Sequence, residues 1–144
     1  MHMHMRWFDS PVTSLEELSK EHPMNLALWV AQGILAFVFI AAGGMKLLAY
    51  QKYRAMLEKT GPTTLTRGTI TLIGIVELAG AGGVVLPVAA NIAPWLSVWA
   101  ASGLAVIMLS ATVFHVRRRE PPIMTIVLFL LAIFVVYGRA GHGA

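Results

Sequence analysis

Four long apolar stretches, separated by short polar segments, dominate the chain. Each is close to the length of about 20 residues that a helix needs to cross the hydrocarbon core of a bilayer. The pattern therefore predicts an all-α fold, an integral membrane four-helix bundle. The predicted spans are residues 26–46, 69–90, 94–116 and 121–138.

The first 25 residues mix polar and apolar residues, unlike the long apolar stretches of the rest of the chain. Ser14-Leu15-Glu16-Glu17 has the form of a capping box, in which Ser and Glu satisfy free amides at a helix start. It predicts a short N-terminal interfacial helix over residues 14–21, closed by Pro23 and resting on the membrane surface. The domains expected are thus residues 1–25, the bundle at 26–139, and a flexible tail at 140–144.

The opening MHMHM alternates two residue types that copper accepts as ligands. The plainer interpretation is a disordered or added terminus, and no metal site is assigned. We expect residues 1–12 and 140–144 to be poorly ordered, because they offer little apolar surface to offset the entropy of ordering.

Composition supports a membrane protein and excludes several kinds of chemistry. Hydrophobic residues make up 57% of the 144 and charged residues 12%, whereas soluble domains average about 25% charged. The chain has no cysteine, which excludes disulfides, thiol catalysis and cysteine-ligated iron or zinc. It has no Gly-rich phosphate loop, nucleophile elbow or paired-His zinc motif.

The basic residues predict how the bundle lies in the membrane. The net charge is +4, and eight of the 11 Lys and Arg residues fall in the first and third connections between spans. These connections should therefore lie in the cytoplasm, with both termini outside. The first connection, residues 46–68, should also contain a short interfacial helix at 50–59. Basic residues placed beside apolar spans indicate membrane orientation, so no nucleic-acid partner is expected.

One acid lies within the second apolar stretch. Glu77 shares a helix side with Gly74, Gly80, Ala81 and Val84, at spacings of three and four. Small residues let helices approach closely in lipid, and a charge facing lipid is costly. Glu77 should therefore face the interior of the bundle.

Several polar residues should lie in the same half of that bundle, judged by their expected depth below the membrane surface. Glu77 should lie about 12 Å inside the cytoplasmic surface, and Ser110 about 9 Å, at 1.5 Å per residue. Gln32 falls in the opposite half. The predicted intramembrane polar cluster consists of Lys46, Glu77, Ser110, Thr112 and His115.

Two interpretations of this cluster remain open. In a structural one, Glu77 accepts hydrogen bonds from Ser110 or Thr112 and is neutralised by Lys46. In a functional one, the cluster binds a polar head group or moves a proton in a pocket between helices. Haem is not expected, because His22 and His142 would lie on the opposite face from His115.

Several segments in order resemble the DoxX-like family of small four-helix bacterial membrane proteins. They are FVFIAAGGMKLLAY (37–50), IGIVELAGAGGVVLP (73–87), LSATVFH (109–115) and VYGR (136–139), and the resemblance covers residues 26–139. It implies a multi-pass protein of the bacterial inner membrane. Relatives include a membrane subunit of a thiosulfate:quinone oxidoreductase and a membrane partner in an oxidant-defence complex. Lys46, Glu77 and His115 match, but no catalytic role is known to carry onto them.

Three functions follow from these observations. The first is a membrane subunit or anchor associated with a redox enzyme, near quinone. The second is a small transporter or binder of a lipophilic molecule, using a pocket around Glu77. The third is a structural or assembly protein. No cofactor is evident, although quinone or lipid would suit the first two functions. The bilayer is the expected partner, with a soluble or membrane oxidoreductase or a homo-oligomer left open.

Overall fold

A computed structural model describes residues 10–141, with side chains from Pro23 onward, and contains five helices in that range. They are α1 (Ser10–Leu48), α2 (Tyr50–Glu58), α3 (Arg67–Ala89), α4 (Trp95–Arg117) and α5 (Ile123–Gly141). The all-α fold is confirmed. Four segments are long and apolar enough to cross a membrane: Pro23–Leu48, Arg67–Ala89, Trp95–Arg117 and Ile123–Gly141.

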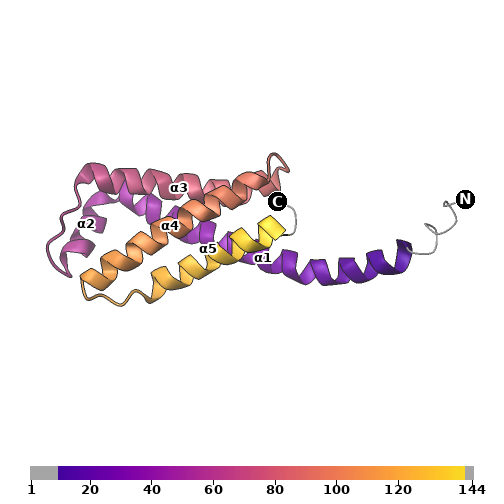
Figure 1. The fold of residues 1–144 in the computed structure, drawn as a ribbon. Coiled ribbons are helices and arrows are strands. Elements are labelled where there is room, and N and C mark those ends of the chain that lie inside the picture. Colours follow the sequence, from indigo (N-terminus) through magenta and orange to yellow (C-terminus); the bar gives the residue numbers. More distant parts are fainter. Residues whose placement is uncertain (1–9, 142–144) are drawn as a thin grey trace, which may run out of the picture.

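The four long helices run side by side as a bundle (Figure 1). Helix α1 packs on α3 and α5, and α4 packs on the same two helices, so the four close a ring. The core between them is apolar, with Leu35, Phe39, Val84, Leu104 and Val135 almost fully buried. Helix α2 packs against α1 at the end of the bundle where α4 finishes and α5 begins (Figure 1).

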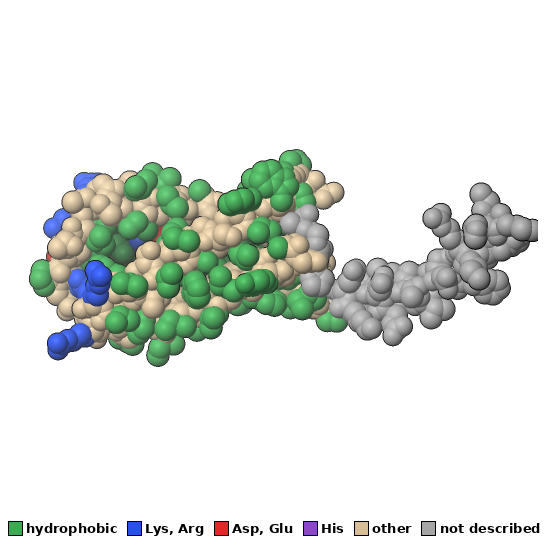
Figure 2. All heavy atoms as spheres, in the orientation of Figure 1, with side chains coloured by type: hydrophobic (Ala, Val, Ile, Leu, Met, Phe, Trp, Pro, Cys, Tyr) green, Lys and Arg blue, Asp and Glu red, His purple; other side chains and the backbone are tan. Residues whose placement is uncertain are grey.

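Large apolar side chains cover the outside of the bundle (Figure 2). Phe37 is 75% exposed, and Leu72, Leu86 and Leu130 are also exposed. Water would disfavour so much apolar surface, whereas lipid accepts it. Lys and Arg side chains gather at the α2 end (Figure 2), as expected for an end that faces an aqueous compartment.

Local chemistry explains the helix boundaries. The Thr66 side chain accepts a hydrogen bond from the Thr69 amide at 3.2 Å, which caps the start of α3. Helix α4 ends where Arg119 adopts a left-handed backbone with φ of 58°. The Glu120 amide then bonds to the His115 carbonyl and the Arg119 amide to that of Val116, a Schellman turn.

The prediction of a separate N-terminal helix closed by Pro23 is wrong. Residues 14–21 are helical, but they belong to one 39-residue helix that passes through Pro23. A proline removes one helical hydrogen bond, but an isolated helix of eight residues is itself marginal in water. The helix therefore continues from the stable span through Pro23 instead of ending there, and α1 extends beyond the bundle (Figure 1).

The predicted flexible ends are only partly described. Residues 10–12 belong to α1, and Ala140 and Gly141 complete α5, so these were wrongly assigned to disordered segments. Both short stretches continue a helix whose hydrogen bonds already exist, which lowers the cost of ordering them. The MHMHM sequence and residues 142–144 lie outside the described residues.

Candidate functional site

A close approach between α1 and α3 positions the central pair of the site. A Cβ atom added at Gly43 would lie 2.8 Å from the Gly74 carbonyl oxygen, and one added at Gly74 only 3.2 Å from that of Gly43. The two backbones are therefore in direct contact, as small residues permit in membrane helices. Lys46 and Glu77 each follow their glycine by three residues, about one helical turn. Both therefore lie in the same seam, the line of close contact between α1 and α3.

Lys46 and Glu77 form a buried ion pair. Lys46 Nζ lies 2.8 Å from Glu77 Oε2, and the two side chains are only 9% and 5% exposed. Nζ also lies 3.5 Å from the Ala42 carbonyl oxygen and 4.9 Å from the centre of the Tyr53 ring. Each charge thus replaces lost hydration with a direct partner.

A cavity of about 840 Å³ opens beside this pair, between the four spans and α2. Figure 2 shows the surface hollowed near the α2 end. Most of the wall is apolar, including Phe39, Ile107, Leu128 and Met124. The polar and charged side chains on the wall are Lys46, Tyr53, Thr60, Glu77, Ser110, His115, Glu120 and Thr125.

Ser110 and Thr112 do not reach Glu77. The Ser110 hydroxyl donates to the Val106 carbonyl at 3.0 Å. The Thr112 hydroxyl lies 2.8 Å from the Met108 carbonyl oxygen and 2.9 Å from Thr125 Oγ1. Hydroxyls in apolar helices bond readily to the carbonyl one turn back, which leaves no proton for a distant carboxylate. Ser110 still lines the cavity, whereas Thr112 instead joins α4 to α5.

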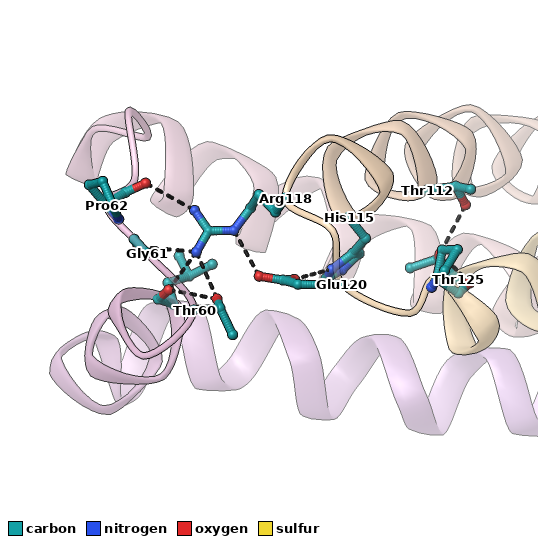
Figure 3. Close-up of polar contacts among 10 residues, drawn as sticks. Thr60, Gly61, Pro62, Thr112, His115, Arg118, Glu120 and Thr125 are labelled. Carbon is teal, nitrogen blue, oxygen red and sulfur yellow. Dashed lines mark hydrogen bonds and ion pairs between the residues drawn. The ribbon is translucent and has the colours of Figure 1, made fainter.

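His115 lies near the mouth of the cavity, paired with an acid that sequence reasoning did not select. Its Nδ1 lies 2.6 Å from Glu120 Oε2 (Figure 3). Glu120 also accepts a 2.8 Å bond from Arg118 Nε. Hydrogen bonds from Arg118, then Thr60 and His115, lower the pKa of the Glu120 carboxyl from 4.5 to about 2.

Arg118 connects the end of α4 to the segment between α2 and α3 (Figure 3). Its guanidinium bonds to Thr60 Oγ1 at 2.7 Å and to carbonyl oxygens of Leu57, Gly61 and Pro62 at 2.7, 3.1 and 3.0 Å. A planar fork of donors suits such a ring of oxygens better than a lysine would. It holds the α2–α3 connection over the cavity end of the bundle.

Tyr53 is another wall residue that the sequence did not reveal. Burial, and secondarily the charge of Glu77, raise the pKa of its hydroxyl, so it stays protonated. Its sequence signal was weak, because only the amphipathic pattern of α2 indicates that this tyrosine faces the bundle. For Glu120, the clue was an isolated acid directly after three arginines.

At the opposite end of the bundle, polar groups join all four spans. Arg139 on α5 donates to Gln32 and Asn25 on α1, with 2.9 Å from Nε to Gln32 Oε1. Gln32 Nε2 in turn donates to Ser97 Oγ on α4 at 3.2 Å and to the Val84 carbonyl on α3. The arginine also lies over the Trp29 ring. This network fixes the register of the helices. Sequence reasoning did not select Arg139, because the residue lies close to the end of the last span.

The family comparison covers most of the chain, including the cavity. The sequence model of the DoxX-like family matches residues 30–137. The chain belongs to the DoxX-like family. With four spans, it is a multi-pass membrane protein. Neither the characterised proteins nor the solved structures compared with this DoxX-like protein gave a significant match.

The cavity of this DoxX-like protein presents side chains that can bind a polar group. Among the described residues, no group of three His, Asp or Glu side chains could hold a metal ion. The cavity offers an ion pair, hydroxyls and one imidazole. Those groups can orient a polar head and exchange protons with it.

Proposed function

We propose that this DoxX-like protein binds a lipophilic small molecule in the cavity beside Lys46 and Glu77. The observation that carries the proposal is an apolar space of about 840 Å³ with a buried ion pair on its wall. Ligand sites are usually apolar cavities of about 300–1,000 Å³ with a few well-placed polar groups. The apolar wall would hold the body of the molecule, and the ion pair would orient its head.

The position of the charges favours binding over a purely structural role. Apolar residues of similar size often replace a buried ion pair without loss of stability, so stability alone is a weak reason for one. Ionisable groups within membrane spans usually mark a substrate or ion pathway. In this protein the helix register is already specified at the other end, by Gln32 and Arg139.

Association with a redox enzyme remains a second candidate, which rests on the family resemblance. A quinone in its reduced quinol form would suit the same cavity, because it combines a hydroxyl-bearing ring with an apolar tail. This role predicts that the protein co-purifies with a soluble or membrane oxidoreductase from its own cells, at constant stoichiometry. Repeated purification without such an enzyme would contradict it while leaving ligand binding intact.

Native mass spectrometry of the detergent-purified protein tests the binding proposal. A retained small molecule should appear as an added mass on the intact chain. Ala111→Phe places a ring into the cavity, because Ala111 lines it. Ala41→Phe is the matched control, because Ala41 is on the same apolar bundle but exposed and outside the cavity wall.

The expected result is an adduct on the wild type and on Ala41→Phe that is lost from Ala111→Phe. An adduct equally retained by all three proteins would place the molecule outside the cavity. Titration with lipophilic probes then covers the case in which purification strips the ligand. Failure of every such probe to bind the wild type would overturn the proposal.

A further inference from the structure

We propose that the head group recognised in this cavity is an uncharged hydroxyl, which donates a hydrogen bond to Glu77. This inference rests on the proposed function, because it names the ligand class of the same site. It follows from which hydrogen-bonding atoms on the cavity wall are already satisfied and which are not.

The carboxylate of Glu77 has one unused oxygen. Oε2 accepts the bond from Lys46, whereas Oε1 accepts none from any described residue. Every fully enclosed side-chain nitrogen or oxygen among the described residues has a hydrogen-bond partner. Oε1 must therefore border open space, and the space that Glu77 borders is the cavity. A charged acceptor left without a donor in an apolar site is costly, which favours a ligand that supplies one.

One further wall residue also offers an acceptor. The Ser110 hydroxyl donates its proton to the Val106 carbonyl, which leaves its lone pairs free to accept. Glu77 and Ser110 thus both present acceptors, and a ligand head that only accepts hydrogen bonds would leave them unsatisfied.

The charges on the wall select against a charged head. The lining contains two carboxylates, Glu77, which pairs with Lys46, and Glu120, which pairs with Arg118 and His115. An anionic head beside Glu77 would be repelled by the Glu77 carboxylate. A cationic head at Glu77 would lie close to the Lys46 ammonium, 2.8 Å from the same carboxylate. An uncharged donor meets neither repulsion.

Tyr53 can complete the recognition of a hydroxyl. Its phenol group lies on the cavity wall and makes no hydrogen bond with another described residue. A ligand hydroxyl can donate to Glu77 and accept from Tyr53 with the same oxygen. An ether oxygen could still accept from Tyr53 but has nothing to donate.

A matched pair of probes separates these possibilities. 4-Nonylphenol and 4-nonylanisole share a tail and ring, and differ in whether the oxygen carries a proton. We expect the phenol to bind the wild-type protein in detergent about tenfold more tightly, as a hydrogen bond to a charged group would provide. Glu77→Gln, which keeps the shape but removes the charge, should shrink this preference.

Each outcome decides a separate point. Equal affinity of the two probes, both excluded by Ala111→Phe, would overturn the hydroxyl inference and leave the cavity as a binding site. A phenol preference unchanged in Glu77→Gln would also overturn it, since the donor would be recognised elsewhere. Binding of both probes that Ala111→Phe does not reduce would instead overturn the proposed function. The comparison on wild-type protein remains decisive if Glu77→Gln fails to fold.

Discussion

At the scale of single residues, the buried ion pair is the most consequential feature. Lys46 and Glu77 are both more than nine-tenths buried, so each would be left without a partner if the other were removed. The sequence placed both residues in the same half of the bundle and Glu77 inward. It could not choose among Lys46, Ser110, Thr112 and His115 as partners of Glu77, because depth does not fix the direction in which a side chain points around its helix.

Removing one member of this pair should destabilise the protein. Lys46→Met leaves an unpaired carboxylate in the bundle and should cost about 3 kcal/mol of unfolding free energy. Lys46→Met combined with Glu77→Leu should recover much of that loss. Arg54→Met is the control, because the Arg54–Glu58 pair is 50% exposed and solvent screens its charges, so its loss should barely change stability. Thermal unfolding in detergent measures all of these, and equal losses for Lys46→Met and Arg54→Met would refute this account of the pair.

Glu120 predicts a specific dependence on pH. Its folded-state pKa of about 2 is lower than the ordinary 4.5, so the ionised carboxyl stabilises the fold. That contribution is complete above pH 4.5 and is lost as the pH falls from 4.5 towards about 2. Thermal midpoints across this range should therefore fall more steeply for the wild type than for Glu120→Gln. Parallel curves would show that Glu120 is not held by Arg118 and His115 as described.

At the scale of elements, the seam between α1 and α3 determines the geometry of the site. Gly43 and Gly74 bring the two backbones together, and Lys46 and Glu77 meet as a result. Arg118 and the Schellman turn at Arg119 then bring Glu120 and the α2–α3 connection to the cavity end. These contacts depend on turn geometry and on partners far away in sequence, so local patterns did not reveal them.

The adjacent glycines of α1 provide a matched test of this seam. Gly43→Ala would bring a methyl group to 2.8 Å from the Gly74 carbonyl oxygen, whereas nothing lies within 4 Å of one at Gly44. Gly43→Ala should therefore cost about 1–3 kcal/mol, and Gly44→Ala should be neutral or stabilising by up to about 1 kcal/mol. Thermal unfolding of the two variants gives the comparison. A stability loss at Gly44 with none at Gly43 would show that α1 is rotated from its described position.

Sequence reasoning located helices better than it located their ends and partners. The four spans followed from apolar length alone, and the short helix α2 was also predicted from the sequence. The capping box and Pro23 suggested a break in α1 because each was judged locally, without the long helix that continues through them. Arg139 was missed because its burial depends on Gln32 and Asn25, more than 100 residues earlier.

At the scale of the whole molecule, the two ends of the bundle differ. One end is joined across all four spans by Gln32, Ser97 and Arg139. The other end contains the cavity, covered by α2 and surrounded by basic residues (Figure 2). If the charge rule sets the orientation, the cavity lies in the cytoplasmic half of the membrane.

Cysteine labelling tests that orientation directly, because the chain has no cysteine of its own. Thr64→Cys lies in the basic first connection and Asn91→Cys in the uncharged second one, and both positions are exposed. An impermeant thiol reagent added to intact cells should label Asn91→Cys and spare Thr64→Cys. Both should label after the cells are opened. The reverse pattern in intact cells would invert the orientation without changing the bundle.

The central claim is that a lipophilic molecule occupies the cavity beside Lys46 and Glu77. Photo-crosslinking with a lipophilic diazirine probe in lipid nanodiscs tests it most directly, with the modified residues mapped by mass spectrometry. Met108 is 5% exposed and lines the cavity, whereas Met45 is 41% exposed and lies outside its wall. The account predicts adducts around Met108 that excess 4-nonylphenol displaces, while adducts around Met45 persist. Labelling confined to outward-facing residues such as Met45, or unaffected by the competitor at Met108, would contradict it.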